Sequence, residues 1–228
     1  MQRSVAINNE PEIGPTISLQ QRVYDNLRNR LISGEFAPGD VLSLRRIAAA
    51  NGVSPMPVRE AVKRLISERA IELLPNRTIV IPKLRRRDFV ELIRIREMIE
   101  GHAGELAVSA MSSKFVVKLA QINSRLLQAI VDGNMVEAMR LNEEFHFELY
   151  RVSKSLVILP LIESLWMRMG PIIHIAIGRP EVTWNASQHH AALLALEQHD
   201  ADGVRRAIEA DIHNSGHELL SLDIFAPD

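Results

Sequence analysis

The stretch that decides the fold is LISGEFAPGDVLSLRRIAAANGVSPMPVREAVKRLISERAIELLPNRTIVIP, residues 31–82. A turn at Pro38-Gly39 separates a preceding helical pattern from a short helix that follows Ser43. That short helix should end at Gly52, because glycine readily takes the left-handed conformation of a helix C-cap. The next helix is expected to begin at Ser54. The stretch therefore predicts two short helices in close succession.

The segments on either side complete this unit. Upstream, apolar residues recur at helical spacing after Ser18, a suitable N-cap. Downstream, residues 71–74 and 78–81 read as two short strands around the tight turn Pro75-Asn76-Arg77, and Pro82 ends the second strand. Three helices followed by a β-hairpin form a winged helix-turn-helix.

Beyond Asp88 the apolar pattern is helical throughout, interrupted by short polar or Gly- and Pro-containing breaks. Six helices are expected, at residues 86–111, 113–132, 134–153, 155–177, 183–198 and 201–222. Helices joined by such short loops pack antiparallel as a bundle. We thus predict a mainly α protein with a disordered arm (1–17), a winged helix-turn-helix (18–82), a linker (83–87) and a helical effector-binding domain (88–228).

The charges divide along the chain in the same way. Residues 19–87 hold 14 Lys and Arg against 6 Asp and Glu, whereas residues 88–228 hold 12 against 20. A segment of net charge +8 beside one of −8 indicates a polyanionic partner for the first segment alone. Clustering of solvated surface charge is the alternative explanation.

Composition excludes several other classes of protein. The chain has no cysteine, so it holds neither disulfides nor thiolate metal sites. Its longest apolar runs fall short of the ~18 residues that a membrane span needs, and its start lacks the apolar core of a secretion signal. We therefore expect a soluble cytoplasmic protein with no membrane partner.

The helix that begins after Ser54 has the side chains of a DNA-recognition helix, whose N-terminal end enters the major groove. Arginine can bridge two acceptors of guanine, and lysine contacts phosphate as a point charge. Solvated helix faces would also carry such cations, but not concentrated on this fold in a +8 segment. The residues expected to contact DNA are Arg45, Arg46, Ser54, Arg59, Lys63, Asn76 and Arg77.

At this point the sequence resembles the DNA-binding domain of the GntR family of bacterial transcription regulators. The G-x-x-x-P-G-x-x-L turn, the N-G-V-S break and the P-V-R-E-A helix stand at that family's spacing, over about 65 residues without a gap. The resemblance implies that Arg45 and Arg59 are the principal DNA-contacting arginines and that Arg77 is a wing residue. Pro55 stands where the family commonly has arginine, and proline cannot read a base. We therefore expect either fewer base contacts per half-site than in a typical member, or a shift of that role to Arg45, Arg59 or Lys63.

In the helical region, polar side chains lie on otherwise apolar helix faces. Asn142 and His146 share a face, His189 lies on another helix, and Asp211 lies on the last one. Two imidazoles with oxygen ligands suit zinc, nickel, manganese or iron, and the sequence does not choose among these divalent metals. An inward histidine that is merely hydrogen-bonded in the core is the alternative.

This region is similar to the FCD ligand-binding domain of the FadR-like branch of the GntR family, with six helices as in the VanR-like subgroup. The segments RIREMIEGHAGELA and NEEFHFELY carry the similarity. In metal-binding members an Asp and three His hold the ion, which implies Asn142, His146, His189 and Asp211 here. Two of these four positions depart from the family pattern. A two-residue shift of the alignment would place His213 in the site instead of Asp211.

The resemblance also implies an organic-acid effector. Arg96 matches a family position that faces the effector, so Arg96, His146 and His189 are the expected effector-binding residues, and a guanidinium pairs well with a carboxylate. We expect a homodimer, acting as a repressor on a palindromic operator. A ligand-independent DNA-binding protein with a vestigial pocket is the alternative. The chain has no HExxH pair or nucleophile–base arrangement, so we do not expect an enzyme.

Overall fold

The computed structural model describes residues 17–177, 179, 182 and 186–227. The predicted arm, 1–17, lies outside the described residues except for Ile17. In chain order the elements are α1 (Leu19–Ile32), β1 (Val41–Leu42), α2 (Leu44–Asn51), α3 (Pro55–Ser67), β2 (Glu72–Leu73), β3 (Ile79–Val80), α4 (Arg86–Ala110), α5 (Ser113–Val131), α6 (Met135–Val152), α7 (Ile158–Ala176), α8 (Ser187–Glu197) and α9 (Ala201–Leu220).

The N-terminal domain is a winged helix-turn-helix, as the sequence predicts. The Oγ of Ser18 accepts a hydrogen bond from the backbone of Gln21 and so caps α1, while Gly52 ends α2 in the left-handed conformation. Helices α1 and α3 bury apolar faces against each other, including Leu27 and Leu65, each no more than 1% exposed. Helix α1 therefore supports the helix-turn-helix by packing against the buried face of α3.

The wing contains one strand more than the sequence predicts. The strands form an antiparallel sheet in the order β1-β3-β2, with Val41 opposite Val80 and Glu72 also opposite Val80. Strand β1 has only two residues and follows the Pro38-Gly39 turn directly, so it shows no alternating pattern that the sequence could reveal.

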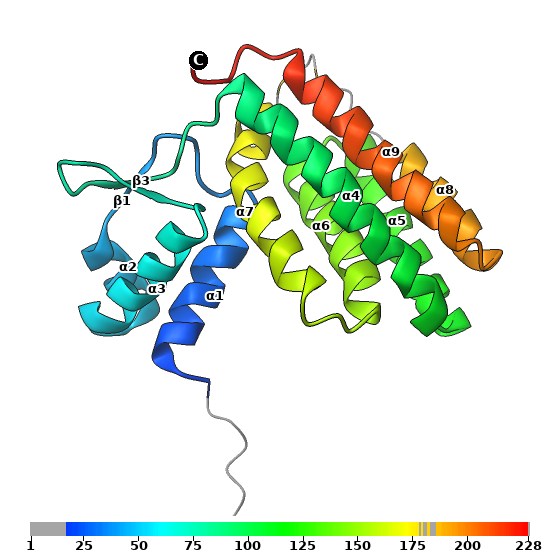
Figure 1. The fold of residues 1–228 in the computed structure, drawn as a ribbon, viewed down its shortest axis with the longest axis horizontal. Helices are drawn as coiled ribbons and strands as arrows, with labels where there is room; N and C mark the ends of the chain where they lie inside the picture. The colour runs from blue at the N-terminus through cyan, green and yellow to red at the C-terminus, as the bar shows by residue number, and fades with distance from the viewer. Residues whose placement is uncertain (1–16, 178, 180–181, 183–185, 228) are drawn as a thin grey trace, which may run out of the picture.

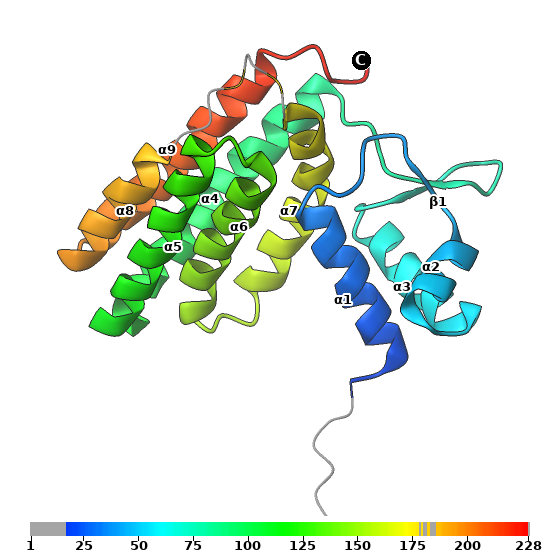
Figure 2. The same ribbon diagram turned by 180° about the vertical axis from the view of Figure 1, so that it is seen from behind.

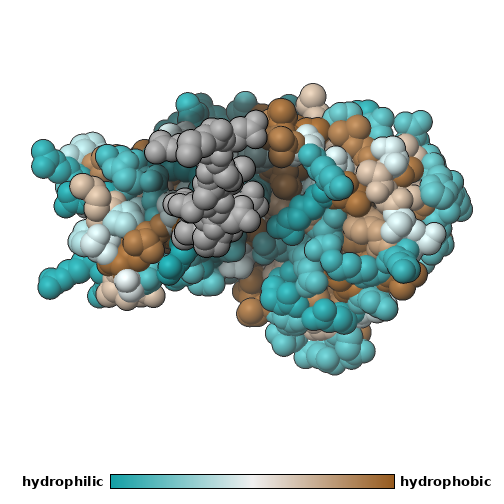
Figure 3. Space-filling view, turned by 90° about the horizontal axis from the view of Figure 1, so that it is seen from below, coloured by the Kyte–Doolittle hydropathy of each residue, from teal (hydrophilic) through white to brown (hydrophobic). Residues whose placement is uncertain are grey.

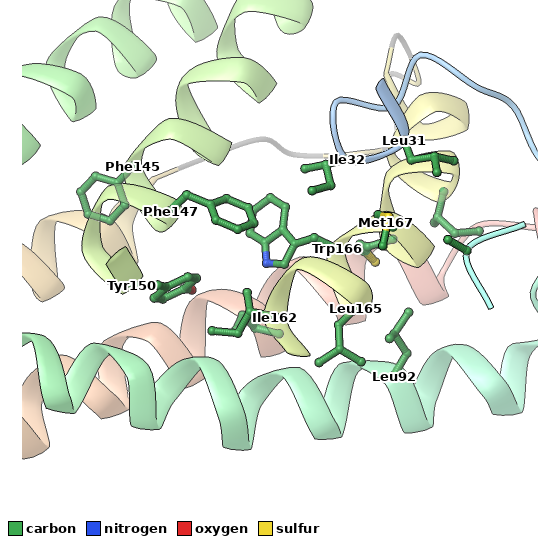
Figure 4. Close-up of a cluster of buried hydrophobic side chains, with 14 of the residues drawn as sticks. Leu31, Ile32, Leu92, Phe145, Phe147, Tyr150, Ile162, Leu165, Trp166 and Met167 are labelled. Atoms are coloured by element: carbon green, nitrogen blue, oxygen red, sulfur yellow. The ribbon is translucent and has the colours of Figure 1, made fainter. Parts of the chain in front are cut away.

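Helices α4 to α9 form the predicted six-helix bundle. Helices α4 and α9 pack along each other at the front of Figure 1, and α5 and α6 lie behind them (Figure 2). The bundle core holds large aromatic side chains, among them Phe145, Phe147, Tyr150 and Trp166 (Figure 4). Most of the observed helix bounds lie within a few residues of the predicted ones. This agreement arises because the apolar residues whose spacing predicts each helix are also the residues that the helix buries in the core. The predicted start of the fifth helix, at residue 183, lies outside the described residues.

The two domains pack together through α1 and α7. Arg28 of α1 forms an ion pair with Glu163 of α7 at 3.2 Å, and the Nδ1 of His174 lies 2.6 Å from the carbonyl oxygen of Gly34. Leu31 and Ile32 lie beside Met167 and Trp166 in a shared hydrophobic cluster (Figure 4). The C-terminal end of α1, the first helix of the N-terminal domain, thus packs against the helical bundle.

The linker between the domains is fastened to the end of the chain. Helix α4 already begins at Arg86, and the carbonyl oxygen of Leu84 accepts a hydrogen bond from the backbone of Ala226. A guanidinium nitrogen of Arg86 donates to the carbonyl oxygen of Leu220, and Phe89 packs on Phe225 with ring centroids 4.9 Å apart. The C-terminal segment therefore holds the linker in place.

The described helices include none long and apolar enough to cross a membrane. Viewed from below, the surface is largely hydrophilic, and hydrophobic atoms appear in a band between the two domains and in smaller groups over the bundle (Figure 3). Exposed apolar side chains include Met98 of α4, Val117 of α5 and Leu161 of α7.

Candidate DNA-binding surface and effector site

The recognition helix α3 has an unusual N-terminus. Ser54 is its N-cap residue, but the serine side chain makes no capping hydrogen bond, and Pro55 and Pro57 have no backbone N–H. The end of this helix consequently offers fewer backbone donors to a phosphate than an ordinary helix N-terminus. Instead it presents the side chain of Met56, which is 64% exposed.

The predicted DNA-binding arginines are available to contact DNA. Arg45, Arg46 and Arg59 are exposed, and among the described residues no carboxylate pairs with any of them. Lys63 differs, because its Nζ lies 2.7 Å from a carboxylate oxygen of Glu60. A phosphate contact by Lys63 would compete with this ion pair, so the three arginines are the stronger candidates.

The two predicted DNA-binding residues of the wing, Asn76 and Arg77, differ in their surroundings. The side-chain oxygen of Asn76 accepts a hydrogen bond from the backbone of Thr78 at 3.0 Å, so Asn76 shapes the turn between β2 and β3. Arg77 is exposed and has φ +65°, a left-handed conformation that closes the turn. Arg77 is therefore presented at the tip of the wing, while part of the Asn76 amide is already occupied.

The structure brings His146 of α6, His189 of α8 and Asp211 of α9 together. The two Nε2 atoms are 3.2 Å apart, and the oxygens of Asp211 lie 3.2 Å from the Nε2 of His146 and 3.9 Å from that of His189. Donor atoms bonded to one ion at 2.0–2.2 Å are separated by about 3 Å, so this spacing fits a common metal ion. His213, the alternative, is exposed and pairs with Glu97 at 3.0 Å.

Neighbouring polar side chains orient both imidazoles. The Nδ1 of His189 lies 3.2 Å from the side-chain oxygen of Asn123, and the Nδ1 of His146 lies 2.9 Å from the hydroxyl of Tyr150, which itself donates to Glu100. Each Nδ1 therefore carries a proton and donates it, which leaves each Nε2 with a lone pair. With a lone pair on each Nε2, two ring nitrogens and a carboxylate oxygen converge as a set of metal ligands would.

The buried carboxylate of Glu100 links Tyr150, which orients His146, to Trp166 and Arg96. It accepts hydrogen bonds from Tyr150 and from the indole of Trp166, each at 2.8 Å, and from the guanidinium of Arg96 at 2.6 Å. Arg96 uses Nε and Nη2 for Glu100, and no other described residue accepts from its Nη1. A ligand oxygen can therefore bind Nη1 without disturbing the ion pair.

The electrostatics of the three residues suit metal binding. Burial lowers the pKa of His189 to about 4, against the attraction of Asp211, so its imidazole is neutral near pH 7. Burial opposes the charged form of Asp211, but the two histidines and Arg96 together lower the pKa of this carboxyl below its usual value. A neutral imidazole and an ionised carboxylate are the protonation states that a divalent cation requires.

A cavity of about 70 Å³ reaches Asp211, whereas His146 and His189 are not among the residues that line it. Asp211, Arg96 and Asn142 line it, and so do Ile32 and Ser33 from the end of α1. Asn142 thus lies in the wall of the same cavity as Asp211, and its role as a fourth ligand remains a prediction. The cavity is bordered by both domains, which the sequence did not reveal.

Sequence reasoning missed the residues that orient the site. Tyr150 follows His146 by four residues, and Glu100 follows Arg96 by four, so each pair shares a helix face and could have been found by that spacing. Asn123 of α5 has no such signal, because its contact with His189 depends on how two separate helices pack. His174, for which the sequence offers no partner, contacts the DNA-binding domain through Gly34.

A winged helix with unpaired arginines, joined to a helical bundle with a buried polar cavity, defines a DNA-binding regulator with a ligand-binding domain. Family models confirm this class: the one described as "Bacterial regulatory proteins, gntR family" matches residues 19–81, and the FCD domain model matches residues 91–214. The chain belongs to the GntR family and carries an FCD domain. It is a transcription regulator, not an enzyme.

Relatives of known name agree. The HTH-type transcriptional regulator McbR of Escherichia coli K12 is 32% identical over 195 residues, covering 84% of this chain and 88% of the relative. The transcriptional repressor RspR of the same strain is 26% identical over 216 residues, covering 93% and 94%. The solved structure of E. coli McbR/YncC superposes with a TM-score of 0.80 at 30% identity, covering 90% of this chain and 98% of that one.

Proposed function

We propose that this regulator is a cytoplasmic repressor that binds a palindromic operator as a homodimer and responds to a small carboxylate held beside a divalent metal ion. The observation that carries the proposal is the convergence of His146, His189 and Asp211 next to a cavity that both domains line. A relative named as a repressor, RspR, supports the direction of control.

The donor set fits a metal ion. His146, His189 and Asp211 would hold the ion, and Asn142 is the candidate fourth ligand from the same cavity wall. The ion would supply positive charge to attract a carboxylate. Two nitrogens and one carboxylate are compatible with zinc, nickel, manganese or iron.

The chain's own residues would complete the carboxylate site. Arg96 is held rigidly by Glu100, and its Nη1 is directed to no protein acceptor among the described residues. A guanidinium fixed in this way binds an oxygen without losing conformational entropy. Because Arg96 and Asp211 line one cavity, a carboxylate there can meet both the metal and the guanidinium.

Binding in this cavity can control DNA binding because Ile32 and Ser33 border it. A ligand alters the position of the DNA-binding domain only if it binds one arrangement of the domains better than another. A ligand that contacts the end of α1 would bind with different affinity to domain arrangements in which α1 is placed differently. The linker, 83–87, is attached to the C-terminal segment, so any movement of the linker would require that segment to follow.

The experiment uses the intact protein, tested by zinc titration and by operator binding. We expect His189→Ala to lower zinc affinity by at least about 100-fold, because it removes a ligand. His213→Ala is the matched control, since His213 is an exposed histidine on α9, and it should leave zinc affinity unchanged. Equal zinc affinity in both variants would contradict the metal site.

The carboxylate is tested separately with propionate as the probe. Arg96→Lys keeps the positive charge beside Glu100 but lacks the second terminal nitrogen, so propionate affinity should fall while zinc affinity is retained. Operator binding that is indifferent to zinc and to propionate would favour the alternative, a ligand-independent DNA-binding protein with a vestigial pocket.

A further inference from the structure

The exposed face of the recognition helix α3 carries a large apolar side chain, that of Met56. The opposite face of α3 is buried in the domain core through Val58, Ala61, Val62 and Leu65. Met56 precedes Arg59 by three residues and Lys63 by seven, and all three side chains are exposed. Residues at this spacing lie on one face of a helix, so Met56 shares the DNA-facing surface with the two cations.

The N-terminal end of α3 is apolar where hydrogen-bond donors would be expected. Pro55 and Pro57, on either side of Met56, have no backbone N–H. The side chain of Met56 is 64% exposed, so it contributes little to the core. This is the end of the helix that enters the major groove. The thymine C5-methyl is the apolar group that base pairs display in that groove, and apolar side chains recognise it.

The backbone that carries Met56 is held in place. Proline fixes its own φ angle, so Pro55 and Pro57 restrict the chain on both sides of Met56. Helix α3 also packs along α1, which fixes the orientation of the whole helix in the domain. The methionine side chain itself is flexible and can adapt to an irregular apolar surface. A rigid helix end therefore presents an adaptable apolar contact.

The position of Arg59 limits which base pair Met56 can reach. An α-helix rises about 1.5 Å per residue, so the two residues are separated by about 4.5 Å along the helix axis. Successive base pairs are about 3.4 Å apart. The base pairs that Met56 and Arg59 contact should therefore lie within about two steps of each other.

We propose that Met56 determines part of the operator sequence by packing against the C5-methyl group of a thymine in the major groove, within about two base pairs of the base that Arg59 contacts. Each half-site then contains a thymine whose methyl group contributes to affinity. This inference deepens the operator binding in the proposed function, and it does not depend on the metal ion or the carboxylate.

The experiment begins with the wild-type protein, which selects its preferred sequence from a library of random duplex DNA. Each thymine of the selected duplex is then replaced in turn by deoxyuridine, which lacks only the C5-methyl group. Fluorescence anisotropy measures the affinity for each duplex. We expect one thymine in each half-site at which loss of the methyl lowers affinity by about three- to fivefold, the effect of exposing one buried methyl group.

Variants identify the side chain that recognises the methyl group. Met56→Ala should lose the preference for thymine over uracil, and its retained binding of the uracil duplex would show that it is folded. Met56→Leu keeps an apolar side chain and should keep the preference. Arg59→Ala should weaken binding to both duplexes and also keep the preference. Met98→Ala is the matched control, since Met98 is 68% exposed on α4 of the effector domain, and it should retain the preference.

The possible failures are distinguishable. If uracil replaces every thymine of the operator without effect on wild-type affinity, or if Met56→Ala keeps the full preference for thymine, this inference is overturned while operator binding through the arginines stands. If the selection enriches no sequence, both sequence-specific operator binding and the role of Met56 are overturned.

Discussion

Gly170 of α7 lies directly against the carbonyl oxygen of Leu31, the penultimate residue of α1. A Cβ at position 170 would overlap this oxygen and would lie 3.0 Å from the carbonyl oxygen of Ile32. The absence of a side chain is therefore what lets the DNA-binding domain dock on the effector domain at this distance. The same contact brings Ile32 and Ser33 to the effector cavity.

Gly170→Ala should force α1 away from α7 and lower the free energy of unfolding by about 1–3 kcal/mol, as overpacking against rigid backbone does. Gly101→Ala is the control, since the three atoms nearest to its Cβ would all belong to the side chain of Glu209 and not to rigid backbone. Both substitutions gain helix propensity, so the difference in their urea unfolding isolates the docking contact. Equal stability of the two variants would contradict this role of Gly170.

Arg59→Ala should weaken operator binding and reduce the slope of log affinity against log salt by about one, because it removes an exposed, unpaired cation from the recognition helix. Fluorescence anisotropy at several salt concentrations measures both quantities. Arg205→Ala, an exposed arginine on α9, is the control and should change neither. An unaltered affinity and slope for Arg59→Ala would show that α3 is not the DNA-recognition helix.

Tyr150→Phe should lower zinc affinity by about 10–100-fold although Tyr150 is not a ligand. The hydroxyl accepts a hydrogen bond from the Nδ1–H of His146 and donates one to Glu100, so its loss frees the imidazole to rotate. Tyr24→Phe removes a hydroxyl that donates to Glu68 in the other domain and should have no effect on zinc. Zinc titration of the two variants measures the difference, and equal affinities would mean that Tyr150 does not orient the ligand.

Glu143→Gln should stabilise the protein in a pH-dependent way. Burial raises the pKa of Glu143 from 4.5 to about 6, so the folded state disfavours the ionised form, and the unfavourable contribution develops as pH rises through this range. At pH 8 the variant should be more stable than the wild type by about 1–2 kcal/mol, and the difference should close below pH 4.5. Urea unfolding at pH 4 and pH 8 tests this, with Glu144→Gln as the control. A difference that does not vary with pH would refute it.

The sequence predicted the elements of this protein because local patterns specify them. Gly52 ends its helix at the expected residue, and the six bundle helices follow from apolar periodicity. The sequence also placed His146, His189 and Asp211 on inward faces, and the structure shows that these three meet. Strand β1 was missed because two residues carry no period.

The sequence by itself determined the class of protein: the spacing of turns and helices and the separation of basic from acidic segments are properties of the linear chain. Only the tertiary structure decided that Asp211 rather than His213 joins the histidines, that Asn123 orients His189, and that α1 borders the effector cavity. These contacts depend on how helices distant in the chain rotate and pack. A close approach such as that of Gly170 to Leu31 exists only after the two domains have docked.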